Sequence, residues 1–367
     1  MRQTVLLIIC LALILAVAPA CDNVPDYAGE GGVLDNPIGL AINWPYAYVT
    51  NANFDLSDDK VGWISVIDLP TALVERKRAV LRHVETKPYL AKIILNNDKS
   101  RAFVADRRSN HVRIFDLSKP GFPEQIDVKP NDEGVQGIEV ARQPYGLALT
   151  ADGKTLLAAC IGSGDVSIVD VENRKLIRNV RLAAGITEVK IQPGTNHAYV
   201  TNQDLNAITV IEADTGAFLT AFGAFGGFSL FGFDFRGLDF TPDGKSLFVA
   251  SRSPSAVLMV DTDKLPLQPD RAVLRILPSE DAPIDAEVRP DGLEAWVTNY
   301  DDNSIMAYDA LTGRLLGAMD TGAGPTDIAF FENPENPGYY YALVANFLSH
   351  NLTLLDAMTK EVIWSIP

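Results

Sequence analysis

The chain has 367 residues, of which 47% are hydrophobic, and its formal net charge at pH 7 is −16. Such an acidic surface repels nucleic-acid phosphates, so we expect no nucleic-acid partner. The hydrophobic share is ample for a large core, and β architectures of this length often form one domain.

The first twenty residues differ from the rest. Arg2 is followed by an apolar run over residues 5–17 that contains no charge, and the letters "APA" then precede Cys21. This is the layout of a secretory signal peptide. The apolar core is shorter than the roughly 20 residues of a membrane span. The sequence therefore predicts an exported protein that loses residues 1–20.

Two processing routes fit the residues around Cys21. The letters "APA" suit ordinary cleavage after Ala20. A cysteine at the cleavage point also resembles the lipobox of bacterial lipoproteins, although Ala18 stands where leucine is usual. We favour lipidation of Cys21, because the position of the cysteine is otherwise a coincidence. Residues 21–35 then tether the folded domain to the membrane, on the periplasmic or extracytoplasmic side.

The remaining chain repeats one short motif. The letters "YVTN" occur twice, and near-copies include "FVAD", "FVAS", "WVTN" and "LVAN". The final residues of the seven copies, which we call the anchors, recur every 42 to 55 residues. The anchors are Asn51, Asp106, Cys160, Asn202, Ser251, Asn299 and Asn346.

Each anchor has similar surroundings. An apolar start such as "PIGLAI" or "PYGLAL" lies upstream, often followed by a turn such as "ADGK" or "PDGK". Asp-Gly is a strong hairpin signal. A strand such as "SVID" or "SIVD" follows the anchor, and a fourth strand often comes after a "TG" turn. Each repeat is therefore expected to form four short strands.

A four-stranded unit of this size cannot bury both of its faces alone, but stacking such units around an axis buries both. The sequence predicts an all-β fold, a seven-bladed β-propeller with four antiparallel strands per blade, over residues 36–367. The first inner strand begins near Pro37 and the last outer strand is Glu361–Pro367, so blade 7 needs no strand from the N-terminus. Only Thr71–Val84 is expected to contain a helical turn or two.

These repeats resemble the YVTN family of β-propeller repeats, and most closely the single-domain, YncE-like proteins exported by bacteria. The resemblance covers residues 36–367. It implies the seven-bladed fold and an exported location. It implies no particular activity, since propellers related to this family perform unrelated chemistry.

Motifs of known chemistry are absent. His83, His111, His197 and His350 are not at metal-binding spacing from one another, and we expect them on the surface or in turns. Haem-attachment, nucleophile-elbow and dinucleotide-binding motifs are also missing. Cys160 lies in the apolar run "TLLAACIG" and is expected to be a buried thiol. We predict no catalytic residue, metal or cofactor.

Charged residues in the inner strands are the first candidate site. Inner strands surround the channel, and a buried charge is costly unless it is paired. These residues either pair across neighbouring blades or hold a polar ligand or cation on the axis. The set also includes Glu188 and Lys190, and its candidate ligand-binding members are Lys92, Arg236, Asp239, Asp285, Glu287 and Asp327.

A phenylalanine-rich segment between blades 4 and 5, Ala221–Gly237, is the second candidate. An exposed apolar patch usually marks a contact surface. The segment is expected either to plug one mouth of the channel or to dock against a protein partner or the membrane. Its candidate contact residues are Phe222, Phe225, Phe228, Phe231 and Phe233, and Phe235 follows them.

The resulting functional hypothesis is a monomeric binding or scaffold module at the cell envelope. Its partner is an unidentified protein or small molecule, and lipidated Cys21 anchors it to the membrane. The alternative is a propeller enzyme, either a lactonase-like hydrolase or a quinoprotein-type dehydrogenase subunit. The sequence contains no motif for either activity.

Overall fold

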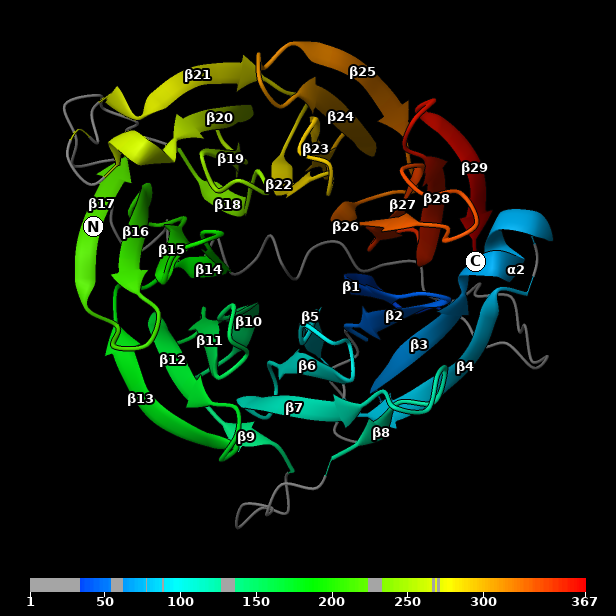
Figure 1. The fold of residues 1–367 in the computed structure, drawn as a ribbon, viewed down its shortest axis with the longest axis horizontal. Helices are drawn as coiled ribbons and strands as arrows, with labels where there is room; N and C mark the ends of the chain where they lie inside the picture. The colour runs from blue at the N-terminus through cyan, green and yellow to red at the C-terminus, as the bar shows by residue number, and fades with distance from the viewer. Residues whose placement is uncertain are drawn as a thin grey trace, which may run out of the picture.

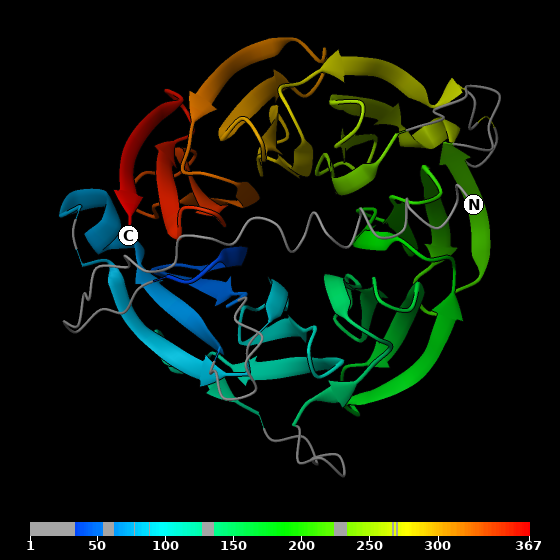
Figure 2. The same ribbon diagram turned by 180° about the vertical axis from the view of Figure 1, so that it is seen from behind.

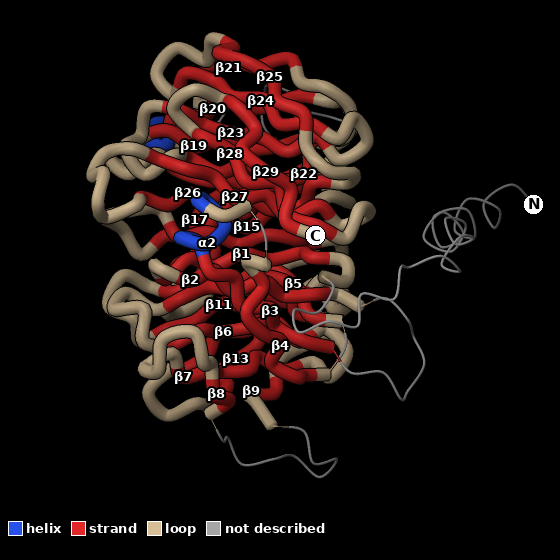
Figure 3. Tube along the Cα trace, turned by 90° about the vertical axis from the view of Figure 1, so that its right-hand side faces the viewer, coloured by secondary structure: helices blue, strands red, loops and turns tan. Residues whose placement is uncertain are grey.

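The computed structural model describes residues 34–53, 62–76, 78–87, 89–126, 136–223, 233–265, 268 and 271–367. They form seven antiparallel sheets arranged in a ring (Figure 1), and the view from behind shows the same ring (Figure 2). The predicted seven-bladed β-propeller is therefore confirmed. Almost all of the described regular structure is strand (Figure 3).

The blades follow one another in sequence order. Blade 1 consists of β1 (Pro37–Asn43), β2 (Tyr46–Asn51), β3 (Gly62–Asp68) and β4 (Val80–Thr86). Blade 2 consists of β5 (Leu90–Leu95), β6 (Arg101–Asp106), β7 (His111–Asp116), β8 (Glu124–Gln125) and β9 (Ile138–Glu139). Blade 3 consists of β10 (Pro144–Leu149), β11 (Thr155–Cys160), β12 (Asp165–Asp170) and β13 (Lys175–Arg181).

Blades 4 and 5 consist of β14 (Ile186–Ile191), β15 (His197–Asn202), β16 (Ala207–Glu212) and β17 (Phe218–Gly223); and β18 (Phe235–Phe240), β19 (Ser246–Ser251), β20 (Ala256–Asp261) and β21 (Val273–Pro278), with the 3-10 helix η1 (Thr262–Lys264). Blades 6 and 7 consist of β22 (Pro283–Val288), β23 (Glu294–Asn299), β24 (Ser304–Asp309) and β25 (Leu315–Asp320); and β26 (Pro325–Glu332), β27 (Tyr340–Asn346), β28 (Asn351–Asp356) and β29 (Glu361–Ile366).

All seven anchors end the second strand of their blade, as the repeat predicts. In two blades the anchor side chain also accepts hydrogen bonds from the backbone of the turn that follows. The Oδ1 atom of Asn202 accepts hydrogen bonds from the backbone N–H groups of Asp204 (3.0 Å) and Leu205 (2.8 Å). Asp106 accepts one from Ser109 in the same way, at 3.0 Å. The motif is therefore a strand with its own turn signal.

Alternate residues of each second strand contact opposite neighbours. In β19, Leu247 and Val249 belong to the core shared with blade 4, whereas Phe248 and Ala250 belong to the core shared with blade 6. Side chains of a strand point alternately to its two faces, so a blade with a neighbour on each side needs apolar residues at successive positions. The motif recurs because every blade meets this requirement.

The ring closes where blades 7 and 1 meet, and blade 7 supplies all four of its own strands, as predicted. The hydroxyl of Thr326 donates to the carbonyl of Pro37 at 3.3 Å, and the N–H of Leu40 donates to Asp327 at 2.6 Å. Asn36 donates to the carbonyl of Phe347 at 2.9 Å. Closure therefore uses hydrogen bonds between blades rather than a strand exchanged from the N-terminus.

Three local features differ from the expectations. The helical turns expected within Thr71–Val84 are one short helix, α2 (Leu69–Val74), and β4 follows it. The outer strand of blade 2 consists of two short pieces, β8 and β9, that both pair with β7. His111 begins β7 and is buried, so its expected place on the surface was wrong. Among the described residues, no helix is both long and apolar enough to cross a bilayer.

Candidate functional site

The third residues of the seven inner strands form a layer around the channel, which we call the first axial layer. Its members, from blade 1 to blade 7, are Gly39, Lys92, Gly146, Glu188, Gly237, Asp285 and Asp327. Glycine alternates with a charged side chain. A Cβ atom added to Gly146 would lie 2.4 Å from the Glu188 carboxylate, and one added to Gly237 would lie 2.4 Å from that of Asp285. Gly146 and Gly237 therefore make room for the side chain of the next blade.

Seven is odd, so this alternation must fail once around the ring. It fails between blades 6 and 7, where Asp285 and Asp327 occupy adjacent positions. Lys92 belongs to β5, which lies across the channel from β22 in Figure 1. Its ammonium group contacts both carboxylates, at 2.6 Å for Asp327 and 3.3 Å for Asp285. One ammonium group thus compensates two aspartates that would otherwise repel each other in a buried position.

The fifth residues of the inner strands form the second axial layer. They are Ala41, Ile94, Ala148, Lys190, Asp239, Glu287 and Ala329. Lys190 again contacts two carboxylates, with its Nζ atom 3.2 Å from Glu287 and 3.4 Å from Asp239. Asp239 also accepts a hydrogen bond from the N–H of Val288 at 2.9 Å. Charge pairing in this layer joins blades 4, 5 and 6.

Burial shifts the pKa values of charged side chains in both axial layers. It raises the pKa of Asp285 to about 7; Lys92 lowers that pKa and Asp327 raises it further. Burial also raises the pKa of Glu287 and of Glu188. For Lys92, burial acts to lower the pKa, but Asp285 and Asp327 outweigh it and keep that pKa well above its usual value. The lysines therefore stay charged, while the Asp285 carboxyl group is partly protonated near neutral pH.

The structure brings together five of the six predicted channel residues in these layers. The expectation of pairing between neighbouring blades was wrong for Lys92, whose partners lie on blades 6 and 7. Its long side chain reaches across the axis because the third position of blade 1 is glycine. Arg236, the sixth predicted residue, binds Asp234 at 2.8 Å instead.

One mouth of the channel is lined by the residues that follow the seven anchors. In each blade, the backbone N–H of this residue donates to the carbonyl of the residue before the inner strand, at 2.8–3.2 Å. The repeated bond fixes these residues at the rim. They are Ala52, Arg107, Ile161, Gln203, Arg252, Tyr300 and Phe347.

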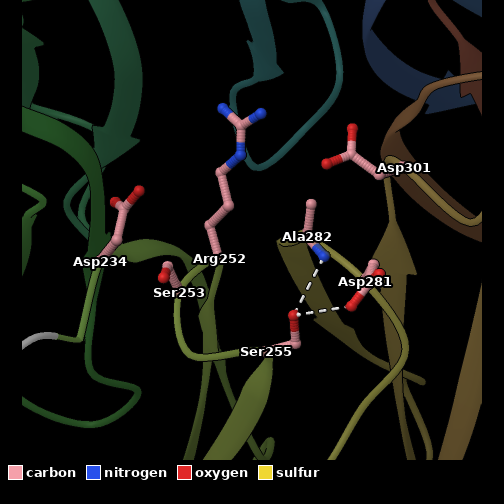
Figure 4. Close-up of a pocket in the computed structure, with 7 residues that line it drawn as sticks. All are labelled: Asp234, Arg252, Ser253, Ser255, Asp281, Ala282 and Asp301. Atoms are coloured by element: carbon pink, nitrogen blue, oxygen red, sulfur yellow. Dashed lines mark hydrogen bonds between the residues drawn. The ribbon is translucent and has the colours of Figure 1, made fainter.

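A pocket of about 370 Å³ opens at this mouth between blades 5 and 6 (Figure 4). Its lining residues are Asp234, Arg252, Ser253, Ser255, Asp281, Ala282 and Asp301. The Arg252 side chain extends away from Asp234 in this view. In the described part of the chain, neither Arg252 nor Asp301 forms a side-chain ion pair or hydrogen bond. The pocket therefore contains a positive and a negative side chain, Arg252 and Asp301, that form no ion pair with each other or with another described residue.

Aromatic residues connect this pocket with the rest of the mouth. Burial raises the pKa of Tyr300; the charge of Arg252 lowers it, and Asp301 and Tyr145 raise it. Burial also raises the pKa of Tyr145, against the effect of Lys92 in the first axial layer. Both phenol groups therefore remain protonated at neutral pH and are able to donate hydrogen bonds.

Arg107 lies on the other side of the mouth, on blade 2. Its guanidinium group is 4.6 Å from the centre of the Tyr89 ring and 5.6 Å from that of Tyr145. Its Nε atom is buried and has no hydrogen-bond partner among the described residues. The mouth thus contains two arginines, from blades 2 and 5, whose guanidinium groups form no ion pair with any described carboxylate.

Arg252, Tyr300 and Asp301 were not among the residues predicted from the sequence. The signal that places them at the mouth is their position one or two residues after an anchor. The same position in some other blades holds apolar residues, so the signal alone does not single them out as a site.

Part of the phenylalanine-rich segment belongs to the core. Phe222 is the second-last residue of β17 and is buried, and Phe235 is the first residue of β18 and is fully buried. Phe233 packs against the same core and stacks on Phe235 with ring centres 5.9 Å apart. Phe225, Phe228 and Phe231 lie outside the described residues. The segment available for an external contact is therefore shorter than the sequence suggested.

Other candidate chemistry is not supported by the geometry. Cys160 is buried, and its burial raises the pKa of the thiol to about 12, which keeps it unreactive. Within the described part of the chain, no group of three or more His, Cys, Asp and Glu residues is arranged to hold a metal ion.

Comparisons with known proteins show similarity at the level of structure. No family model and no curated protein matches the chain. The solved structure of Kuenenia stuttgartiensis hydrazine synthase matches with a TM-score of 0.69 at 15% identity, over 91% of this chain and 99% of that one.

Two further structures are similar. A functionally unknown protein from Desulfotomaculum acetoxidans matches with a TM-score of 0.64 at 14% identity, over 83% of this chain and 92% of that one. A protein from Lactobacillus plantarum matches with a TM-score of 0.63 at 18% identity, over 81% and 88%. At these identities the comparisons establish the fold alone. Together with the sheet topology, they show that the chain is a seven-bladed β-propeller.

Proposed function

We propose that this protein is a binding module of the bacterial cell envelope that holds a small polar ligand at the mouth of its central channel. The observation that carries the proposal is the pocket between blades 5 and 6, in which Arg252 and Asp301 have no partner among the described residues. Concave sites with a few convergent polar groups are the usual form of small-molecule sites.

The two axial layers support this site by holding the blades together around the channel. Lys92 and Lys190 each contact two carboxylates, so their charges are already compensated by the protein. These contacts join blades 2, 4, 5, 6 and 7 around the axis. A rigid scaffold lowers the ordering cost of binding at the loops that it supports.

The ligand proposal is tested by thermal unfolding in the presence of amino acids, sugar acids, other organic acids and divalent ions. The variants are Arg252→Gln and, as a matched control, Arg275→Gln on the exposed face of β21 in the same blade. A ligand at a hundredfold excess over its Kd stabilises by about 2.7 kcal/mol. We expect at least one compound to raise the Tm of the native protein and of the control, but not of Arg252→Gln. An equal response of all three, or none, contradicts the proposal.

The envelope location rests on residues 1–21, which lie outside the described residues. The proposal is that residues 1–20 are removed and that Cys21 is lipidated. Mass spectrometry of the N-terminal peptide from the native cells, together with detergent phase partitioning, tests it. We expect an acylated Cys21 and a Cys21→Ser variant that moves to the aqueous phase. An unmodified Cys21 contradicts the anchor.

An enzymatic role is the second candidate, and the pKa of Asp285 favours it. A carboxyl group with a pKa of about 7 in contact with a lysine is suited to general acid–base catalysis. Hydrolysis of simple lactones by the native protein and by Asp285→Asn tests this role, with the exposed Asp320→Asn as control. Turnover that Asp285→Asn abolishes and Asp320→Asn preserves supports an enzyme, and absence of turnover contradicts it.

A further inference from the structure

The pocket between blades 5 and 6 separates two opposite charges that do not pair with each other. Arg252 comes from blade 5 and Asp301 from blade 6, and both line the pocket (Figure 4). Backbone hydrogen bonds fix both residues: the N–H of Arg252 donates to Asp234 at 2.9 Å, and that of Asp301 donates to Asp281 at 3.3 Å. The two charged groups are thus presented to the same space by separate, anchored turns.

The other two aspartates of the pocket already have partners. Asp234 accepts a hydrogen bond from Arg236 at 2.8 Å. Asp281 faces the hydroxyl of Ser255 at 3.5 Å, and that hydroxyl also accepts from the N–H of Ala282 at 3.3 Å. Among the described residues, Asp301 is therefore the aspartate of the pocket whose side chain accepts no hydrogen bond, while Asp281 has only the long contact with Ser255.

On the basis of the proposed function, we infer that the ligand of this pocket is a zwitterion of the α-amino acid class. Its carboxylate binds Arg252 and its ammonium group binds Asp301. Both side chains are exposed to solvent. A ligand with only one charge pairs with either Arg252 or Asp301, whereas a zwitterion pairs with both. The arrangement therefore favours a ligand that carries two opposite charges.

The size of the pocket agrees with this class. The volume of about 370 Å³ exceeds that of an amino and a carboxyl group alone, which leaves room for a side chain.

The inference is tested by isothermal titration calorimetry of the full protein with each of the twenty L-amino acids. The tightest ligand is then compared with its amide, which lacks the carboxylate, and with its N-acetyl derivative, which lacks the ammonium group. A charge-assisted contact contributes enough that its loss weakens binding by about tenfold or more. We expect both derivatives to bind at least about tenfold more weakly than the parent.

Two variants assign each contact. Arg252→Gln is expected to lose the preference for the parent over its amide, and Asp301→Asn the preference over its N-acetyl derivative. Arg275→Gln and Asp320→Asn, exposed residues of the same two blades, are expected to keep both preferences.

The outcomes separate this inference from the proposed function. If the N-acetyl derivative binds as tightly as the parent, the ligand is not recognised as a zwitterion and the inference is wrong. If no amino acid binds but another polar compound does, in a manner that Arg252→Gln abolishes, the inference fails while the binding function stands. If no compound shows Arg252-dependent binding, both fail.

Discussion

Lys92 and Asp327 are 235 residues apart in the sequence, yet the Lys92 ammonium lies 2.6 Å from the Asp327 carboxylate across the channel. The same carboxylate accepts the N–H of Leu40 at 2.6 Å, at the junction where the ring closes. One aspartate therefore joins blade 7 to blade 1 through the backbone and to blade 2 through a buried charge.

Removal of the Lys92 charge is expected to destabilise the ring. Lys92→Met leaves Asp285 and Asp327 adjacent, buried and without their cation, and loss of one partner of a buried pair typically costs about 3–5 kcal/mol. Denaturant unfolding at pH 7.5 measures the loss. The exposed Lys175→Met is the control and should change stability by less than about 0.5 kcal/mol. A loss no larger than that of the control would show that the pair does not support the ring.

Asp285 makes the stability of the protein depend on pH. Its folded pKa, about 7, lies above the usual aspartate value of 3.8, so the folded state holds this proton more tightly than the unfolded state. The resulting stabilisation is complete below pH 3.8 and is lost as the pH rises through about 7. Asp285→Asn removes this contribution. Unfolding measured at pH 5.5 and 8 should show a smaller decrease in the variant than in the native protein, and an equal decrease refutes the assignment.

The glycines of the first axial layer are expected to tolerate no side chain. In Gly146→Ala, the new Cβ atom would meet the Thr187 carbonyl oxygen at 2.8 Å and the Glu188 Cα atom at 2.9 Å. Both are backbone atoms of the next blade, so relief requires the blades to move apart, and overpacking of this kind costs about 1–3 kcal/mol. Gly317→Ala in β25, whose nearest contact is a flexible lysine carbon at 3.4 Å, is the control. Equal Tm values for the two variants would contradict the packing argument.

The phenylalanine-rich segment is tested without damage to the core. Because Phe222 and Phe235 are buried, the variant replaces only Phe225, Phe228 and Phe231 with serine. If the segment docks against a partner, affinity purification from the native cells should lose that partner in the variant, with the Tm unchanged. Retention of every partner would argue against docking and in favour of the channel plug.

The sequence was sufficient to predict the blades because each strand end is determined locally. An apolar strand that ends in Asp106 or Asn202 contains both its packing residues and its own turn signal. The first axial layer was only partly predictable. The charged positions follow from the repeat, but the two partners of Lys92 depend on ring geometry, namely an odd number of blades and a glycine in blade 1.

The mouth pocket was not predictable by the same route. Arg252 and Asp301 lie in turns that connect strands, where many polar residues have no role beyond solvation. Their significance comes from the place of the turns at one mouth and from the absence of partners among the described residues. The buried positions of Phe222 and Phe235 were missed because a run of aromatic residues does not reveal where a strand ends and the next begins.

A crystal structure of the protein with the compound that raises its Tm most tests the central claim directly. The account predicts the ligand in the pocket between blades 5 and 6, with its anionic group at Arg252 and its cationic group at Asp301. A ligand bound within the axial layers, or on the outer strands, would contradict it.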